Sequence, residues 1–315
     1  MPVVLVSTSS FGEHDRRPLE LLEQAGFEVR GNPHRRKLTL GESRELLAPE
    51  FGVPAVGVVA GTETFSRELL AAAPQLQVIS RCGVGMDGID AVAAAEREIT
   101  VLRTTDAHVE AVAELTLGGM LAVLRHLATV DRKLRAGDWH KVMGRQLAGK
   151  TVGIIGLGRT GRRLVELLAP FQVELLAHDP DEDRDFADAH GVTYTPVATV
   201  VAAGDILTLH LDYSPSVHHL LDRETIDTMK PGAIVVNTAR GGLIDERALA
   251  EALRAGRLGG AFLDVFEQEP YSGPLTALDN VLLTAHIGSY ALEGRIAMET
   301  EAAQNLIDAL RERRS

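Results

Sequence analysis

Several residue types are scarce in this chain, and each scarcity excludes a class of protein. The 315 residues include a single cysteine, Cys82, which excludes an intramolecular disulfide framework and fits a reducing cytoplasm. Lysine and arginine number 32 against 44 aspartates and glutamates, and the resulting net charge of −12 disfavours nucleic acid or an anionic membrane as a partner. We therefore expect a cytoplasmic protein with neither kind of partner.

Long apolar runs are also missing. The longest charge-free run, residues 189–204, is interrupted by Pro196 and falls short of the ~18 residues that cross a bilayer. No basic segment precedes the apolar residues at the amino terminus, so we expect no secretory signal peptide.

The most informative stretch that is present reads T-V-G-I-I-G-L-G-R-T-G over residues 151–161. A short apolar strand leads into three glycines and then into a helical pattern, which is the dinucleotide-binding fingerprint. Gly156 permits the tight turn, Gly158 lets the backbone approach a pyrophosphate, and Gly161 lets the helix pack on the strand. The amides of Arg159, Thr160 and Gly161 would then face the phosphates, where the helix dipole favours negative charge.

An acid at the expected distance strengthens this interpretation. A second apolar run ends at Asp179, 18 residues after Gly161, and such an acid accepts hydrogen bonds from the ribose hydroxyls of NAD. Acidic residues follow it, and Arg184 is the nearest cation that could bind a 2′-phosphate. We therefore predict NAD rather than NADP. The alternative is an ordinary strand, turn and helix beside a surface aspartate.

Short apolar runs alternate with helical segments along the whole chain, which predicts doubly wound α/β sheets with helices on both faces. The expected strands are Val3–Val6, Val56–Val59, Val78–Ser80, Val152–Ile155, Val173–Ala177, Ile206–Leu209, Ala233–Val236, Gly260–Leu263 and Val281–Thr284. The expected helices are Leu19–Ala25, Arg67–Ala73, Arg162–Ala169, Glu246–Ala255 and Leu292–Leu310. The fingerprint lies near the middle of the chain, so we expect a separate domain before it.

One further helical segment, Asp106–Arg135, is apolar on nearly every side between Val112 and Leu127. A helix of this character is buried between layers or against a partner chain. We interpret it as an inter-domain and dimer helix, which predicts a homodimer. A helix buried within one domain is the alternative.

Three polar residues follow strands in the second half of the chain. They are Arg240, Glu269 and His286, and ligands of open α/β sheets bind at the carboxyl ends of strands. Each has an alternative role: a helix-capping arginine, a solvated glutamate and a surface histidine.

The motifs around these residues resemble those of the D-isomer-specific 2-hydroxyacid dehydrogenases over almost the full chain. The supporting segments are S-R-C-G-V-G-M-D-G-I-D at 80–90, A-V-A-E at 111–114, G-K-T-V-G-I-I-G-L-G-R-T-G at 149–161, H-D-P at 178–180, M-K-P-G-A-I-V-V-N-T-A-R-G-G-L-I-D at 229–245, A-F-L-D-V-F-E-Q-E-P at 261–270 and A-H-I-G at 285–288. The resemblance implies a Rossmann NAD-binding domain, residues 104–287, inserted in a flavodoxin-like substrate domain formed by residues 1–103 and the helix within 288–315.

The resemblance also implies roles for individual residues. Arg240, Glu269 and His286 would be the catalytic set. Thr105, Thr238 and Asp264 would join the fingerprint in binding the cofactor, and Arg81, Val84 and Gly85 would join Arg240 in binding the substrate. Structural roles are the alternatives: a helix N-cap for Thr105, an ordinary loop aspartate for Asp264 and a salt bridge for Arg81. We predict no metal.

This set suits hydride transfer between nicotinamide and a small 2-keto or D-2-hydroxy acid. Arg240 can grip carboxylate and carbonyl oxygens as a planar fork, and His286, paired with Glu269, can give and take the proton. If Arg81, Lys141 and Arg145 converge, the substrate would carry a second anion such as phosphate or phosphonate.

Two other functions stay open on the sequence. One is an NAD-sensing, corepressor-like interaction protein of the same architecture. The other is a phosphite- or formate-type dehydrogenase. Formate enzymes of this kind pair the histidine with glutamine, so Glu269 counts against formate.

Overall fold

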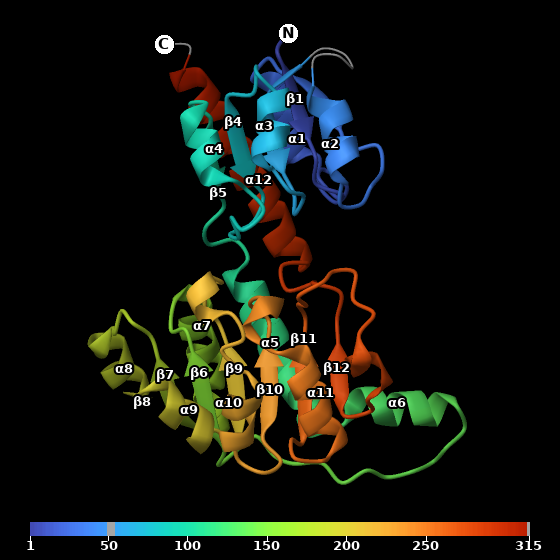
Figure 1. Cartoon of the computed structure of the whole chain (residues 1–315), viewed down its shortest axis with the longest axis vertical. Coiled ribbons are helices and arrows are strands. Elements are labelled where there is room, and N and C mark those ends of the chain that lie inside the picture. The colour runs from blue at the N-terminus through green and yellow to red at the C-terminus, as the bar shows by residue number, and fades with distance from the viewer. Residues whose placement is uncertain (49–53, 314–315) are drawn as a thin grey trace. The chain divides into compact units, whose positions relative to one another are not determined.

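The protein folds into two compact units, one formed by Met1–His108 with Tyr290–Ser315 and the other by Val109–Ser289 (Figure 1). The structure is a computed structural model that describes residues 1–48 and 54–313. Each unit is built on its own all-parallel sheet with helices on both faces. The predicted fold class, two doubly wound α/β sheets, is therefore confirmed.

The first unit contains a five-stranded sheet in the order β2-β1-β3-β4-β5, the arrangement of flavodoxin-like folds. Its strands are β1 (Val3–Val6), β2 (Glu28–Gly31), β3 (Ala55–Ala60), β4 (Val78–Arg81) and β5 (Thr100–Arg103). Its helices are α1 (Arg17–Gln24), α2 (Leu40–Leu47), α3 (Arg67–Ala72), α4 (Ala91–Glu96) and α12 (Leu292–Glu312).

Successive side chains of each strand point to opposite faces of this sheet, and each face forms a hydrophobic core. Val4 and Val6 of β1 pack with residues of α1 and α12, whereas Val3 and Leu5 pack with residues of α2, α3 and α4. Both sets are buried, because helices cover both faces of a parallel sheet. The C-terminal helix α12 is thus an integral layer of the first unit. Gly57 of β3 leaves room for it, since an added Cβ would lie 2.9 Å from Leu306 Cδ1.

The second unit contains a seven-stranded sheet in the order β12-β11-β10-β9-β6-β7-β8. The chain starts at β6, moves outward to β8, and then returns to β9 on the other side of β6. The switch point of this Rossmann-type order therefore lies between β6 and β9. The strands are β6 (Thr151–Ile155), β7 (Glu174–His178), β8 (Val192–Tyr194), β9 (Ile206–Leu209), β10 (Ile234–Asn237), β11 (Gly260–Leu263) and β12 (Val281–Leu283).

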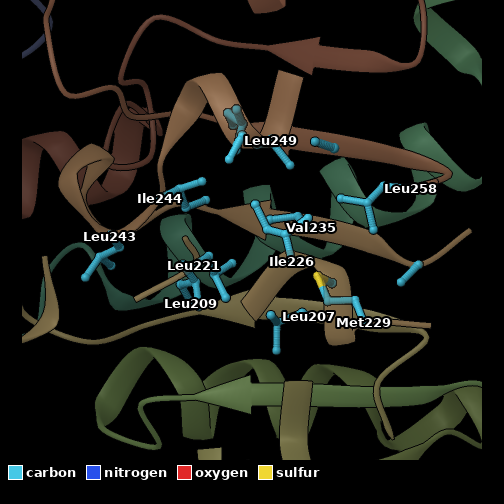
Figure 2. Packing of buried hydrophobic residues seen from close by; sticks show 14 of the residues in the cluster. Leu207, Leu209, Leu221, Ile226, Met229, Val235, Leu243, Ile244, Leu249 and Leu258 are labelled. Atoms are coloured by element: carbon cyan, nitrogen blue, oxygen red, sulfur yellow. The ribbon is translucent and has the colours of Figure 1, made fainter. Parts of the chain in front are cut away.

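Helices α5 (Val109–Leu124) and α7 (Arg159–Leu168) lie on one face of this sheet, where Val152, Ile154 and Phe262 are buried. The other face carries α9 (Val197–Ala203), α10 (Arg223–Thr228) and α11 (Glu246–Arg254). Figure 2 shows the core beneath the second set, in which side chains of β9 and β10 meet Ile226 and Met229 of the α10 region and Leu249 of α11. Helix α8 (Arg184–His190) packs beside β8.

The single helix predicted over Asp106–Arg135 is wrong, because the structure contains two. Helix α5 ends at Leu124 and α6 (Leu127–Arg135) begins after His126, whose φ of 54° lies in the left-handed region. One face of helix α5 is buried inside its own unit, where Gly119 lies so close to Phe262 that a Cβ would meet that ring at 1.9 Å. On the other face, Glu114 and Gly118 are exposed, and a role of α5 between domains or in a dimer stays a prediction. By contrast, no residue of α6 is buried.

Among the described residues, no single helix is long and apolar enough to span a membrane. Helices α5 and α6, bent by 63°, reach that length and apolarity only when the two are taken together.

Three strands and several helices were absent from the expected set. Strands β2, β5 and β8 lie at sheet edges and are half exposed, so they lack the continuous apolar run that marks a buried parallel strand. The helices not expected were α2, α4, α8, α9 and α10, each eight residues or shorter. Segments this short show little helical periodicity.

Candidate functional site

The glycine fingerprint has the local geometry that dinucleotide binding requires. Gly156 ends β6 with a φ of 94°, and a Cβ there would lie 2.6 Å from the carbonyl carbon of His210. Gly161 is equally tight, because its Cβ would lie 2.3 Å from the oxygen of Gly156. Gly158, the N-cap of α7, differs: a Cβ there would meet nothing within 4 Å. The open face at Gly158 and the amides of Arg159 and Thr160 after it would suit a pyrophosphate, and their contact with the cofactor stays a prediction.

Asp179 follows β7 and is tied directly to this turn. Its Oδ2 accepts a hydrogen bond from the amide of Leu157 at 2.7 Å, and its Oδ1 accepts one from Asp181 at 2.9 Å. Arg184, the nearest cation in the sequence, is largely exposed and pairs with Glu182 at 2.9 Å. A shallow hollow beside Asp179 is lined by residues 180–185, four of which are acidic. This surface suits ribose hydroxyls and disfavours a 2′-phosphate.

The three residues proposed for the chemistry follow three neighbouring strands. Arg240 follows β10, Glu269 lies in the loop after β11, and His286 follows β12. Because β10, β11 and β12 are adjacent and parallel, their carboxyl ends meet at one edge of the sheet. The fingerprint follows β6 at the same edge. The topology thus gathers the fingerprint and all three side chains at the edge where α/β folds bind ligands.

His286 and Glu269 form a direct pair. The Nδ1 of His286 lies 2.9 Å from Glu269 Oε2 and 3.1 Å from Oε1. The carboxylate is itself held by the amide of Phe266, which donates to Oε1 at 3.2 Å. A carboxylate on Nδ1 favours the tautomer with a proton there, which leaves Nε2 to exchange a proton with a substrate. Both side chains are partly exposed, 41% for His286 and 34% for Glu269, so a ligand can reach them.

The buried carboxylate of Asp264 holds the turn that carries His286. Asp264 is 1% exposed, and its Oδ1 accepts hydrogen bonds from Thr284 Oγ1 at 2.5 Å and from the amide of Ile287 at 2.8 Å. Its Oδ2 accepts from Gly288 at 2.8 Å, and its carbonyl accepts from the amide of His286 at 2.8 Å. His286 has a φ of 54°, which an L residue adopts only when its surroundings fix it. Asp264 supplies that fixation.

A second buried polar side chain fixes the turn that carries Arg240. Asn237, 1% exposed at the end of β10, donates from Nδ2 to the carbonyl of Arg240 at 2.8 Å and accepts at Oδ1 from Ala239 at 3.0 Å. Gly241, which follows Arg240, lies against the backbone of Phe266, and a Cβ on Gly241 would come within 1.9 Å of it. The turn carrying Arg240 is therefore pressed directly against the loop that carries Glu269.

Comparison with known proteins decides the family. The model for the D-isomer specific 2-hydroxyacid dehydrogenase NAD binding domain matches residues 117–288. The glyoxylate reductase of Thermofilum pendens is 39% identical over 79% of this chain and 76% of its own. The chain belongs to the D-isomer-specific 2-hydroxyacid dehydrogenase family. The predicted family and the NAD cofactor are thereby confirmed.

Two further similarities define the extent of the match. The D-3-phosphoglycerate dehydrogenase of Methanocaldococcus jannaschii is 38% identical over 93% of this chain, and the chain spans 55% of that protein's length. The TT0316 protein of Thermus thermophilus superposes with a TM-score of 0.87 at 33% identity, covering 98% of this chain and 97% of its own. The family consists of NAD-dependent oxidoreductases, and the match with the solved structure includes both units.

Thr238 and Thr105, two residues predicted to bind the cofactor, have partners within their own units. Thr238 follows β10 and its hydroxyl lies 2.9 Å from that of Thr116 on α5, both buried. In the first unit, the amide of Thr105 donates to Glu301 Oε1 on α12 at 3.0 Å. Contact of either residue with the cofactor stays a prediction, as does the division of the chain into a substrate domain and a cofactor domain.

The loop after β4 in the first unit carries the predicted substrate-binding residues. Gly83 has a φ of 141°, and its amide donates to Thr104 Oγ1 at 2.9 Å. Arg81 donates to the carbonyl of Cys82, whose side chain is buried. Burial raises the pKa of the Cys82 thiol to about 11, as expected for a small core residue rather than a reactive thiol. Substrate binding by Arg81, Val84 and Gly85 stays a prediction.

The structure does not bring Arg145 to the proposed site of its own chain. Arg145 Nη1 donates to the carbonyl of Gly232 at 2.7 Å, and Gly232 lies just before β10. Arg240 lies just after β10, so Arg145 and Arg240 lie at opposite ends of that strand. Lys141 is exposed in the segment after α6.

Sequence reasoning missed the roles of Asn237, Asp264 and Thr284 in shaping the two turns. Nothing in the local pattern identifies such residues. Asn237 bonds to the backbone of Arg240, three residues away, and the partners of Asp264 lie 20 to 24 residues away.

Proposed function

We propose that this protein is an NAD-dependent oxidoreductase that interconverts a small 2-keto acid and the corresponding D-2-hydroxy acid. The bound nicotinamide supplies or accepts the hydride. The observation that supports the proposal most strongly is the His286–Glu269 pair at 2.9 Å, on the strand-end edge that also carries Arg240 and the fingerprint.

Each residue of the set has a role that its surroundings allow. Arg240 would bind the substrate carboxylate and carbonyl oxygen through the N–H groups of its planar guanidinium. It would also stabilise the negative charge that develops on the carbonyl oxygen during reduction. His286 would donate its Nε2 proton to the oxygen during reduction and remove it during oxidation. Glu269 would hold the imidazole ring in place through its hydrogen bond with Nδ1. The amides at the start of α7, with Gly158 and Asp179, would hold the dinucleotide.

The relatives suggest which substrates to test. Oxidation of NADH should be followed with glyoxylate, hydroxypyruvate, pyruvate, phosphohydroxypyruvate, phosphonopyruvate and bulkier 2-keto acids. We expect turnover with at least one of them. A second anionic group on the substrate is supported only if the phosphorylated acids have clearly higher kcat/KM than plain ones. Absence of turnover with the whole panel, combined with tight NADH binding, would instead support an interaction protein of the corepressor kind.

Replacement of the proposed acid tests the mechanism. We expect His286→Ala to lower kcat by at least about 100-fold, the lower end of what general acid–base catalysis contributes, while NADH still binds. His190→Ala is the matched control, because this exposed histidine of α8 lies in the same unit and stacks on Phe186 instead. Near-normal turnover by His286→Ala would refute the assignment.

We further propose that two copies associate through α6 and the segment after it, an arm of the second unit (Figure 1). The arm carries four large apolar side chains in water: Leu127 is 52% exposed, Leu134 54%, Trp139 82% and Met143 91%. Apolar groups gathered at this density mark an interaction surface, and pairing of identical chains is the commonest way to cover one. Light scattering should give a dimer for the wild type and a monomer for Leu134→Ser with Trp139→Ser. A monomeric wild type would refute this proposal.

A further inference from the structure

Two consecutive histidines and a glutamate from a distant loop meet on the surface of the second unit. His218 and His219 follow the 3₁₀ turn Pro215–Val217, and Glu267 lies in the loop after β11. Each offers one ligand atom, and these atoms lie within 4.8 Å of one another. His219 Nε2 is already 2.7 Å from Glu267 Oε1. We propose that His218, His219 and Glu267 bind a divalent transition-metal ion, for which Zn²⁺ is the probe.

The backbone brings the two imidazoles together in an unusual way. Side chains of consecutive residues in an extended chain point in opposite directions, yet these rings stack with centroids 3.8 Å apart. The cause is the φ of 51° at His219, a left-handed conformation that non-glycine residues seldom adopt.

Backbone hydrogen bonds hold this conformation. The amide of His219 donates to the carbonyl of Gly242 at 2.8 Å, and that of Leu221 donates to Leu243 at 3.0 Å. The histidine pair is therefore mounted on a fixed scaffold, which lowers the entropy lost when both rings bind one ion.

The partners of the two rings indicate which nitrogen of each would bind a metal. Tyr213 Oη lies 3.2 Å from His218 Nδ1, so it can hold that ring and leave Nε2 as the ligand atom. On His219, the ion would replace the proton that Nε2 now shares with Glu267. Tetrahedral zinc places its ligand atoms about 3.4 Å apart, and an imidazole nitrogen binds through a lone pair in its ring plane. Because the two stacked rings are only 24° from parallel, they must rotate out of the stack to bind one ion. The side chains can do so because His219 is 32% exposed and Glu267 38% exposed.

The local charge favours a cation. The amide of Glu267 donates to Glu246 Oε1 at 2.9 Å, which places a second carboxyl group behind the cluster. Two imidazole nitrogens and one carboxylate suit zinc, nickel or copper better than magnesium or calcium, which prefer oxygen ligands alone.

The site is distinct from the proposed reaction centre but shares a loop with it, since Glu267 lies two residues before Glu269. A test must therefore separate this cluster from the His286–Glu269 pair, which also offers a nitrogen and a carboxylate. Zinc binding should be measured on the full chain, freed of metal with a chelator, by competition with a chromophoric zinc indicator and by calorimetry.

We expect the wild type to bind one equivalent of Zn²⁺ at this cluster with micromolar affinity. His218→Gln and Glu267→Gln should each weaken this binding by at least about tenfold, since loss of even an outer-sphere partner has that effect. His286→Ala should bind as the wild type does. His34→Gln is the matched control, because His34 lies 3.5 Å from the carboxylate of Glu42 in the first unit without a second histidine.

Three results would overturn the proposal. One is less than half an equivalent bound at a free zinc concentration of about 0.1 mM, a very weak affinity for a three-ligand site. Another is unchanged binding by His218→Gln and Glu267→Gln. The third is loss of binding in His286→Ala, which would place the ion at the reaction centre. Circular dichroism of each variant confirms that folding is retained, as expected for exposed side chains.

Discussion

Replacement of Asp264 by asparagine tests whether this buried carboxylate organises the site before any cofactor binds. Asparagine has nearly the same shape, but one accepting oxygen becomes an NH₂ group. In either orientation of the amide, a backbone N–H of Ile287 or Gly288 loses its acceptor. A hydrogen bond to a charged group contributes about 1.5–3 kcal/mol, and the abandoned donor stays buried. For a unit of this length, such a loss lowers Tm by roughly 3–12 °C.

The assay is thermal unfolding of the cofactor-free protein, followed by circular dichroism or a dye. Omitting NADH matters, because a residue that only contacts the cofactor would leave the Tm of the free protein unchanged. Asp279→Asn is the matched control: Asp279 lies in the same unit but is 76% exposed and paired with exposed Arg132. We expect this control to change stability by less than about 0.5 kcal/mol. If Asp264→Asn melts within about 1 °C of the wild type, the turn at His286 does not depend on Asp264.

Three other predictions follow from the same geometry. Gly158→Ala should leave the Tm of the cofactor-free protein unchanged but weaken NADH binding at least about tenfold. Gly161→Ala should lower Tm, because only Gly158 has open space around its Cα. Equal effects of the two substitutions on stability would contradict this interpretation. Burial lowers the pKa of His210 to about 4, below the value of about 6.5 in an unfolded chain. The folded protein should therefore lose stability as the pH falls from about 6.5 toward 4. In urea titrations at several pH values, His210→Gln should make this loss of stability smaller. Asp179→Ala should reduce the preference for NADH over NADPH about 10- to 100-fold in fluorescence titrations, and an unchanged ratio would show that Asp179 does not select the cofactor.

Local sequence patterns were sufficient for the framework of the fold. Buried parallel strands such as β6, β9 and β11 are apolar on both faces, so they appear as continuous apolar runs that can be recognised without tertiary information. The fingerprint was also recognisable, because the spacing of its three glycines between an apolar strand and a helix is itself a local pattern. Residue-level assignment of Arg240, Glu269 and His286 came from the family motifs and not from spacing.

The tertiary structure decided whatever depends on partners far away in the chain. The break after α5 occurs at His126, where the sequence shows neither proline nor glycine, and strands β2, β5 and β8 are defined by the neighbours they pair with. The same holds for function. Asp264 fixes the His286 turn through donors 20 to 24 residues away, and Glu267 meets His219 across 48 residues. A sequence specifies which groups exist, but their meeting depends on the register of strands and the closure of turns, which only the assembled fold determines.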